Sequence, residues 1–164
     1  AVMDVPLLEQ GKGFYSVIFL VPKVTWGFRL VLDLKSLNSF IKVIPFKMKT
    51  LQRIIPMVSK GHFLVTLDLQ DAYYHVPIFP PHQQFLRFCV QGHHLQFKVL
   101  PLCLRSAPRV FTKVVAPLIA HLHLQGIHLY PYLDDWLLHA SSQGQLLEDM
   151  GSLCVGVFGI MASY

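Results

Sequence analysis

The sequence predicts an α+β fold in which an antiparallel sheet is backed by helices. The chain has 164 residues, of which 53% are hydrophobic, so it can bury a core as one domain or as part of a larger one. Several short apolar segments are separated by turns that contain Gly, and one longer segment repeats apolar residues at helical spacing. With only 14% charged residues, the composition excludes an intrinsically disordered chain.

The first third of the chain predicts two strands and a short helix. Residues 14–22 and 28–34 are apolar and rich in β-branched side chains, and a short turn with Gly27 separates them. We expect them to pair as antiparallel strands. Residues 50–58 place apolar side chains at helical spacing behind Thr50, a candidate N-cap, and predict a short helix.

The next segments predict three more strands. Residues 62–69 read as a buried strand that ends in an acid. Residues 85–90 and 95–100 flank Gly92 and predict a hairpin.

A longer helix is predicted over residues 106–125, where apolar residues recur at the spacing of Val110, Val114 and Leu118. Gly126 gives a stop signal, and Pro117 should kink the helix. Two further apolar segments, 127–133 and 136–140, then bracket a pair of acids.

Neither a membrane span nor a disulfide scaffold is expected. The longest stretch without Asp, Glu, Lys or Arg, Val114–Leu133, contains three His and two Pro residues, which do not suit a lipid-facing helix. The N-terminus lacks a basic region followed by an apolar run, so no signal peptide is indicated. Three widely spaced cysteines form no CxxC pair. Because the chain begins with Ala1, we expect a fragment of a longer protein.

The net charge of +5 is divided unevenly along the chain. Residues 1–60 carry seven Lys and two Arg against three acids, a net +6, whereas residues 61–164 carry five basic residues against six acids, a net −1. A basic first third indicates an anionic partner such as a phosphate backbone. A solvated basic face that binds nothing is the alternative.

Asp134 and Asp135 stand between two apolar strand segments, where Asp is disfavoured. Adjacent carboxylates repel each other unless a cation lies nearby. We expect a tight hairpin whose turn presents both acids at the rim of the sheet, facing a divalent metal ion. An exposed turn without any ligand is the alternative.

A second acidic motif favours the metal-binding interpretation over the exposed turn without a ligand. In "LVTLDLQDAYYHVPI" a strand carries Asp68, and Asp71 follows at the start of a turn. An acid on this strand beside the two acids of the hairpin gives three hard oxygen ligands, which suit Mg²⁺ shared with substrate phosphates. Two such ions support phosphoryl transfer, because they activate a hydroxyl nucleophile and stabilise the leaving oxygen.

The motifs "TLDLQDAYYHVPI", "VLPLCLRSAPRVFTK" and "YLDDWLL", in this order and spacing, resemble the palm of reverse transcriptases. "KGFYSVIFLVPK" and "FRLVLDLKSLN" resemble the fingers of the same family, and the similarity is greatest to vertebrate retroelements of the tyrosine-recombinase (DIRS) type. The resemblance covers residues 5–139. It implies a right-hand polymerase fold with a β-rich fingers segment at 1–60, a palm at 61–140, an unmatched tail at 141–164 and no thumb.

The resemblance also implies roles for individual residues. Asp68, Asp134 and Asp135 would hold two Mg²⁺ ions, or Mn²⁺, with Asp135 in a supporting position. The nucleotide-binding residues would be Lys23, Arg29, Asp71, Ala72, Tyr73 and Leu102. Of these, Lys23 and Arg29 would reach the triphosphate, and Tyr73 would be the steric gate against a ribose 2′-hydroxyl. The partners would be an RNA or DNA template-primer and deoxynucleoside triphosphates.

The sequence also departs from the family pattern. Val24, Thr25 and Trp26 replace Lys, Asp and Gly, Cys103 replaces a Gly, and Arg105 replaces a small residue. Two functions therefore remain open. The chain is expected to be an RNA-directed DNA polymerase domain, or else a catalytically dead relic that acts at most as a nucleic-acid-binding module. A fragment named for the ribonuclease H of longer relatives is a third possibility, although no residue of this chain supports it.

Overall fold

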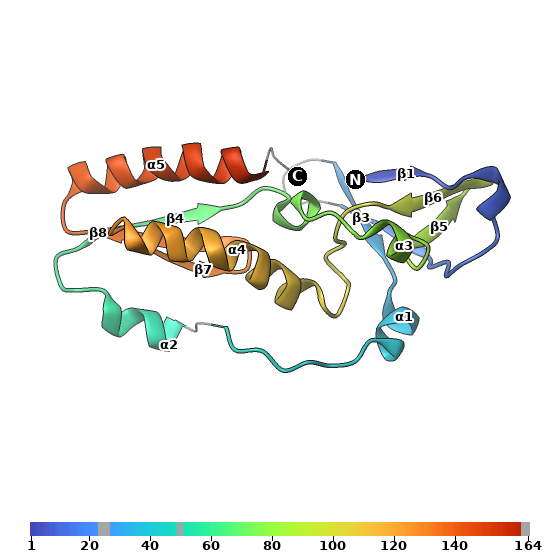
Figure 1. Ribbon diagram of the computed structural model, residues 1–164, viewed down its shortest axis with the longest axis horizontal. Coiled ribbons are helices and arrows are strands. Elements are labelled where there is room, and N and C mark those ends of the chain that lie inside the picture. The colour runs from blue at the N-terminus through green and yellow to red at the C-terminus, as the bar shows by residue number, and fades with distance from the viewer. Residues whose placement is uncertain (23–26, 49–50, 162–164) are drawn as a thin grey trace. The chain divides into compact units, whose positions relative to one another are not determined.

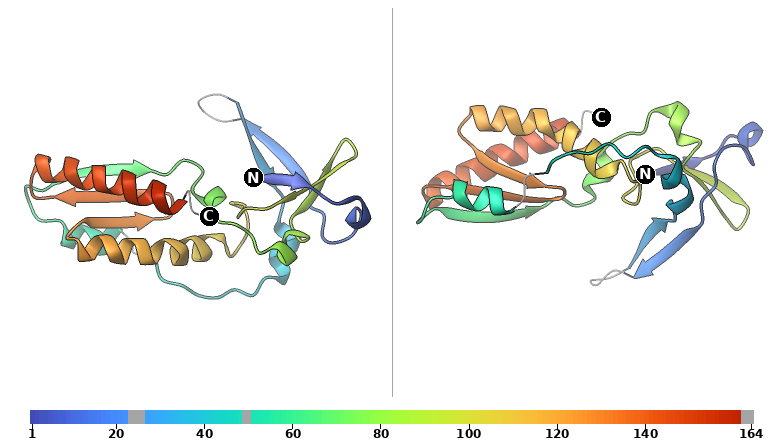
Figure 2. Two further views of the ribbon diagram at one scale, coloured as in Figure 1. Left: turned by 45° about the horizontal axis from the view of Figure 1, so that its top comes forward. Right: turned by 90° about the horizontal axis from the view of Figure 1, so that it is seen from below.

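The computed structural model describes residues 1–22, 27–48 and 51–161, and the chain forms two compact units (Figures 1 and 2). The first unit comprises Ala1–Ile44 and Tyr73–Pro108, and the second comprises Pro45–Ala72 and Arg109–Tyr164. The units thus alternate along the chain. Within the described residues, none of the helices is long and apolar enough to cross a membrane.

The first unit contains a three-stranded antiparallel sheet of order β1-β6-β5 and a separate antiparallel pair, β2-β3. Its strands are β1 (Val2–Asp4), β2 (Ile18–Pro22), β3 (Phe28–Leu32), β5 (Arg87–Val90) and β6 (His93–Phe97). Its helices are η1 (Leu7–Glu9), α1 (Lys35–Phe40) and α3 (Pro80–Gln83), and the 3₁₀ helix η3 (Ala72–His75) begins at the boundary. Both predicted hairpins are therefore confirmed, with shorter strands than expected.

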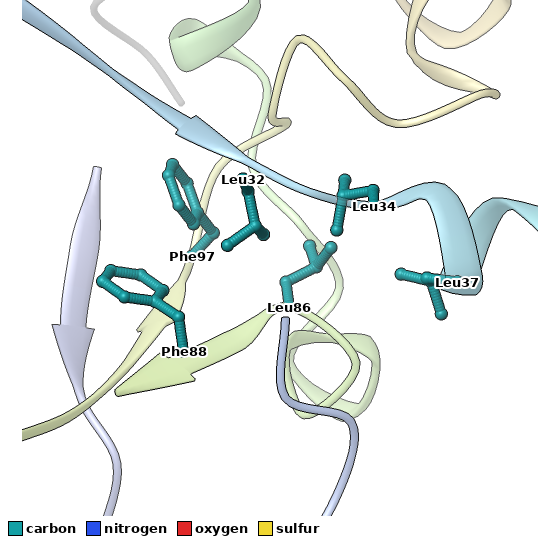
Figure 3. Close-up of a cluster of buried hydrophobic side chains, with 6 residues drawn as sticks. All are labelled: Leu32, Leu34, Leu37, Leu86, Phe88 and Phe97. Carbon is teal, nitrogen blue, oxygen red and sulfur yellow. The ribbon is translucent and has the colours of Figure 1, made fainter. Parts of the chain in front are cut away.

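The core of the first unit joins β3 and α1 to the β5–β6 hairpin (Figure 3). Its buried side chains are Leu32, Leu34, Leu37, Leu86, Phe88 and Phe97. The rings of Phe88 and Phe97 lie 5.7 Å apart between centroids. Burial of these side chains stabilises the unit by about 1.5–3 kcal/mol each.

The second unit contains a three-stranded antiparallel sheet of order β4-β8-β7. Its strands are β4 (Phe63–Asp68), β7 (His128–Tyr132) and β8 (Asp135–Ala140). Its helices are α2 (Leu51–Ile54), η2 (Ile55–Met57), α4 (Ala107–Leu124) and α5 (Gln143–Met161). Figure 1 shows α4 and α5 running alongside the three strands.

Two details of the second unit differ from expectation. The predicted buried strand, β4, is an edge strand, and its Phe63 and Leu64 are 45% and 51% exposed. Because only one of its sides pairs with β8, its side chains receive less cover than those of the central strand. Helix α4 buries Leu118, as its spacing predicts, but in a stripe with Phe111, Val115 and Leu122, while Val114 is exposed. That stripe contains larger apolar side chains and therefore buries more area.

Candidate active site

The two acids at 134 and 135 lie at a tight hairpin, as the sequence predicts, but only Asp134 is in its turn, since Asp135 is the first residue of β8. Strand β7 ends at Tyr132 and β8 begins at Asp135, so Leu133 and Asp134 form a two-residue turn. Leu133 has a positive φ of 56°. A bulky residue rarely adopts this conformation, which costs about 1–2 kcal/mol, so other contacts must maintain the turn.

Two hydrogen bonds hold the backbone of this turn. The amide of Leu69, just past the end of β4, donates to the carbonyl oxygen of Asp134 at 3.0 Å. The indole Nε1 of Trp136 donates to the carbonyl oxygen of Leu133 at 2.9 Å. Trp136 is only 1% exposed, so its ring is fixed by packing. The turn is therefore anchored both to β4 and to the core of its own unit.

Sheet register places Asp68 directly opposite Asp135 in the β4–β8 pair. Asp135 is in turn opposite Tyr132 in the β7–β8 pair. Directly opposed residues in antiparallel strands point to the same face, with Cβ atoms about 4.5–5.5 Å apart. The structure thus brings Asp68 and Asp135 together and places Asp134 next to them in the turn.

In the part of the chain that the structure describes, the side-chain oxygens of these three Asp residues take part in no ion pair and accept no hydrogen bond. Asp68 and Asp135 are exposed, and Asp134 is half-buried. Like charges at opposed strand positions repel each other. A cation at this row would remove the repulsion.

The acids fit Mg²⁺ better than a metal held by protein groups alone. Among residues 1–22, 27–48 and 51–161 there is no group of three or more His, Cys, Asp or Glu side chains that could hold a metal ion. Mg²⁺ does not require such a cage, because it commonly takes one or two carboxylates together with water and substrate phosphates. The opposed pair Asp68 and Asp135, with Asp134 beside it, supplies oxygen ligands of this kind.

The residues that follow β4 lie at the boundary of the two units. Asp71 has a positive φ of 53°, which turns the chain after the strand. Ala72 and Tyr73 begin η3 and are 3% and 4% exposed. Tyr73 therefore has a buried side chain, and its role as a steric gate remains a prediction.

The segment that carries Leu102 belongs to the first unit. Leu102 is 42% exposed and precedes α4. One side chain of helix α1 holds this loop: Asn38 Nδ2 donates to the carbonyl oxygen of Cys103 at 2.9 Å, and Asn38 Oδ1 accepts from the amide of Arg105 at 2.8 Å. Sequence reasoning missed Asn38, although it ends the quoted motif "FRLVLDLKSLN".

The two departures from the family pattern in this loop are accommodated within the chain. Cys103 is not among the described residues with positive φ, so its backbone does not require Gly. Both bonds from Asn38 go to backbone atoms of the loop, so they do not depend on the side chains of Cys103 and Arg105. Partial burial, and then the Asp33 carboxylate, raises the pKa of the Cys103 thiol.

Two predicted nucleotide ligands, Arg29 and Lys23, remain. Arg29 lies in β3, where it pairs with Val21 of β2. Lys23, and the departures at 24–26, lie outside the described residues.

Comparison with known proteins places these elements in context. A family model described as reverse transcriptase (RNA-dependent DNA polymerase) matches residues 21–155. The Pro-Pol polyprotein of feline foamy virus is 28% identical over 143 residues, which is 87% of this chain and 12% of the polyprotein.

Solved structures give the same fold. The crystal structure of prototype foamy virus protease-reverse transcriptase superimposes with a TM-score of 0.76 at 22% identity, over 93% of this chain and 21% of that protein. A foamy viral protease-reverse transcriptase in complex with double-stranded DNA matches with the same TM-score and identity, over 99% of this chain and 26% of that protein. The mixed α+β fold is thereby confirmed over most of the chain.

Proposed function

The chain belongs to the reverse transcriptase (RNA-dependent DNA polymerase) family, and we propose that it is a polymerase domain that adds deoxynucleotides to a primer on an RNA template. The observation that carries this proposal is the row formed by Asp68 and Asp135 across β4 and β8, with Asp134 in the adjoining turn. Residues 1–60 would form the fingers and residues 61–140 the palm. The chain spans about an eighth of the foamy virus polyprotein, so the activity of the whole relative is a proposal for this chain.

The acids would hold two Mg²⁺ ions, the metal that the family generally uses. Bound there, the ions would supply activation of the primer 3′-hydroxyl and stabilisation of the leaving oxygen. Asp68 and Asp134 would be the principal ligands and Asp135 a supporting one. Because Asp135 is directly opposite Asp68, its carboxylate would also add negative charge that attracts the metal ions.

The nucleotide would be held by residues of the fingers motifs and of the palm motifs. Arg29 and Lys23 would bind the triphosphate, since a guanidinium can grip two phosphate oxygens at once. Tyr73 would reject a ribose 2′-hydroxyl, with Asp71 and Ala72 beside it. Leu102 would line the nucleotide pocket on a loop that Asn38 keeps in place.

A template-primer is the proposed macromolecular partner. The net charge of +6 over residues 1–60 supports binding of a phosphate backbone. The foamy viral relative with this fold was solved in complex with double-stranded DNA, which supports the same class of partner.

Primer extension on an RNA template with Mg²⁺ tests the proposal. We expect the chain to extend the primer and a variant with Asp134→Asn and Asp135→Asn not to do so. Equal extension by the two proteins would exclude these acids as metal ligands. A radioactive or fluorescent primer on a sequencing gel gives the sensitivity that a slow enzyme requires.

The alternative of a dead relic is favoured by Cys103 and Arg105, which replace smaller residues in the family pattern. The two short hydrogen bonds of Asn38 go to backbone atoms at Cys103 and Arg105, so the reversal keeps them, although Arg105→Ala loses the 3.4 Å bond from Arg105 Nη1 to the Asn38 carbonyl oxygen. If the chain is inactive and Cys103→Gly with Arg105→Ala restores extension, those side chains disable it. An inactive double variant would place the defect elsewhere.

We also propose that the chain is related to DIRS-type retroelements, which the sequences of the fingers and palm motifs support. A reading frame for a tyrosine recombinase beside the gene would support this assignment, whereas an integrase of the retroviral type would contradict it.

A further inference from the structure

Three histidine rings meet on the sheet of the second unit, at the end away from the acids. His139 lies in β8, His128 is directly opposite in β7, and His62 immediately precedes β4. The rings of His128 and His139 are parallel within 1°, with centroids 5.0 Å apart. The ring of His62 lies 5.2 Å from that of His139. His139 is 2% exposed, whereas His62 is half-buried and His128 is exposed, so the buried ring of the cluster is His139.

One hydrogen bond in this histidine cluster depends on the state of protonation. Nδ1 of His62 and Nδ1 of His139 lie 3.1 Å apart. Two ring nitrogens can form a hydrogen bond only when one carries a proton and the other does not. The contact therefore excludes the state in which both rings are cationic, because both nitrogens would then be donors.

The second ring nitrogen of His139, Nε2, is in a different situation from Nδ1. Nε2 is buried and has no hydrogen-bond partner among the described residues. In neutral His139 this atom can remain an unprotonated acceptor while Nδ1 donates to His62. In the imidazolium form it must be a donor, and a buried cationic N–H without an acceptor is costly.

The groups that surround His139 do not compensate such a charge. Strand β7 contributes His128 and Tyr130, whose ring stacks at 5.5 Å, and the segment before β4 contributes His62. Helix α5 also contacts β8 and carries Glu148, which is exposed, and Asp149, which accepts a hydrogen bond from Gln145 at 2.8 Å. The rings that contact His139 thus include no acid, and two of them are histidines, whose charges lower its pKa.

We propose that the histidine cluster is a pH-sensitive device that holds the β4-β8-β7 sheet together while its rings are neutral and loosens it on mild acidification. This inference does not depend on polymerase activity. Burial, followed by the charges of His128 and His62, lowers the pKa of His139 from its ordinary value of 6.5. The unfolded chain then binds a proton that the folded chain excludes. Stability consequently falls as the pH decreases below 6.5, until the lowered folded value is reached.

A combined titration of the full chain tests the device. The unfolding equilibrium constant is measured in urea at pH about 7.5 and about 5.5, in EDTA so that no metal ion bridges the two Nδ1 atoms. The proton that the folded chain excludes predicts a rise of up to about tenfold over this interval. His139→Asn, which keeps a polar group near the Nδ1 position but does not titrate, should remove about that factor. His93→Asn, at an exposed histidine of the first unit, is the matched control and should leave the rise unchanged.

Imidazole NMR of the folded chain gives an independent readout that needs no variant of the buried ring. We expect the ring signals of His139 to keep a neutral tautomer below pH 6.5. Titration of His139 at its ordinary value would overturn the proposal. An equal pH dependence in the wild type and the His139→Asn and His62→Asn variants would overturn it as well.

Discussion

The Leu133–Asp134 turn and the Leu102–Arg105 loop both carry predicted site residues, yet different forces hold them in place. In the turn, strand register fixes the neighbours of each acid, and Trp136 and Leu69 bind the backbone. In the loop, one amide side chain, Asn38, makes the two short bonds to the backbone. The turn is therefore bound from β4 and from Trp136, whereas the loop is bound to helix α1 through Asn38, in addition to its local backbone bonds from Leu104 to Pro101 and from Ala107 to Leu104.

This difference indicates which changes each site tolerates. The acids at the turn can be exchanged for amides without disturbing the ladder that positions them, so their variants report on charge. Variants of the loop change its position and its chemistry together unless they spare Asn38 and the backbone.

The largest effect is expected from the acids of the turn. Asp134→Asn should reduce primer extension by about 10³-fold, because a lost metal ligand removes several kcal/mol of transition-state stabilisation. Asp135→Asn should reduce it less, since Asp135 is assigned a supporting role. Single-turnover extension with saturating nucleotide measures both. A larger loss in Asp135→Asn would reverse the assigned roles.

The same acids should have the opposite effect on folding. Without metal, Asp135→Asn should stabilise the chain by about 0.5 kcal/mol, because it removes repulsion from the directly opposed Asp68. Urea unfolding in EDTA measures this change. With Mg²⁺ added, the wild type should become more stable than Asp135→Asn. If the wild type is already the more stable protein without metal, Asp68 and Asp135 do not repel each other as proposed.

Trp136 should show how far its hydrogen bond supports the turn. Trp136→Phe keeps most of the buried ring but leaves the Leu133 carbonyl without its indole donor, at a cost of about 1 kcal/mol. Trp136→Ala also empties the site and should cost about 3–5 kcal/mol. Chemical denaturation of the two variants separates these contributions. Equal losses would show that packing of the ring contributes little.

Asn38→Ala should expose the weaker support of the loop. It removes the donor to Cys103 and the acceptor of Arg105, at a cost of about 1–3 kcal/mol. Hydrogen exchange at the Arg105 amide should accelerate in Asn38→Ala and less in Asn38→Asp, which keeps the acceptor. Ser39→Ala on the same helix loses only a local bond to Ser36 and is the control. Unchanged exchange at Arg105 would contradict the account of the loop.

The smallest effect concerns the thiol in this loop. Partial burial and the Asp33 carboxylate raise the pKa of Cys103, so its reactive thiolate is scarce at neutral pH. Asp33→Asn should speed its alkylation by iodoacetamide while keeping an oxygen acceptor for the Lys35 amide. Peptide mass spectrometry follows the reaction, with exposed Cys89 as the internal reference. A slower reaction would mean that the charge of Asp33 does not act on the thiol.

The sequence was sufficient to predict the hairpin of Asp134 and Asp135, because two acids between apolar strands have few other resolutions. The edge position of β4 was missed, since a periodic pattern shows which residues alternate but not how many neighbouring strands cover them. Asn38 could not be placed from sequence either, because its partners are 65 and 67 residues away. The histidine cluster likewise joins residues 77 positions apart.

The most direct test of the central claim is the site of divalent-ion binding. Mn²⁺ prefers oxygen ligands and broadens NMR signals near it, so it serves as a probe for the acids. We predict that backbone signals around Asp68 and Asp135 broaden first, while those of His128 and His139 remain sharp. The double variant with Asp134→Asn and Asp135→Asn should lose this effect. Broadening that is unchanged in the variant, or centred on the histidines, would contradict the assignment of the acids as the metal site.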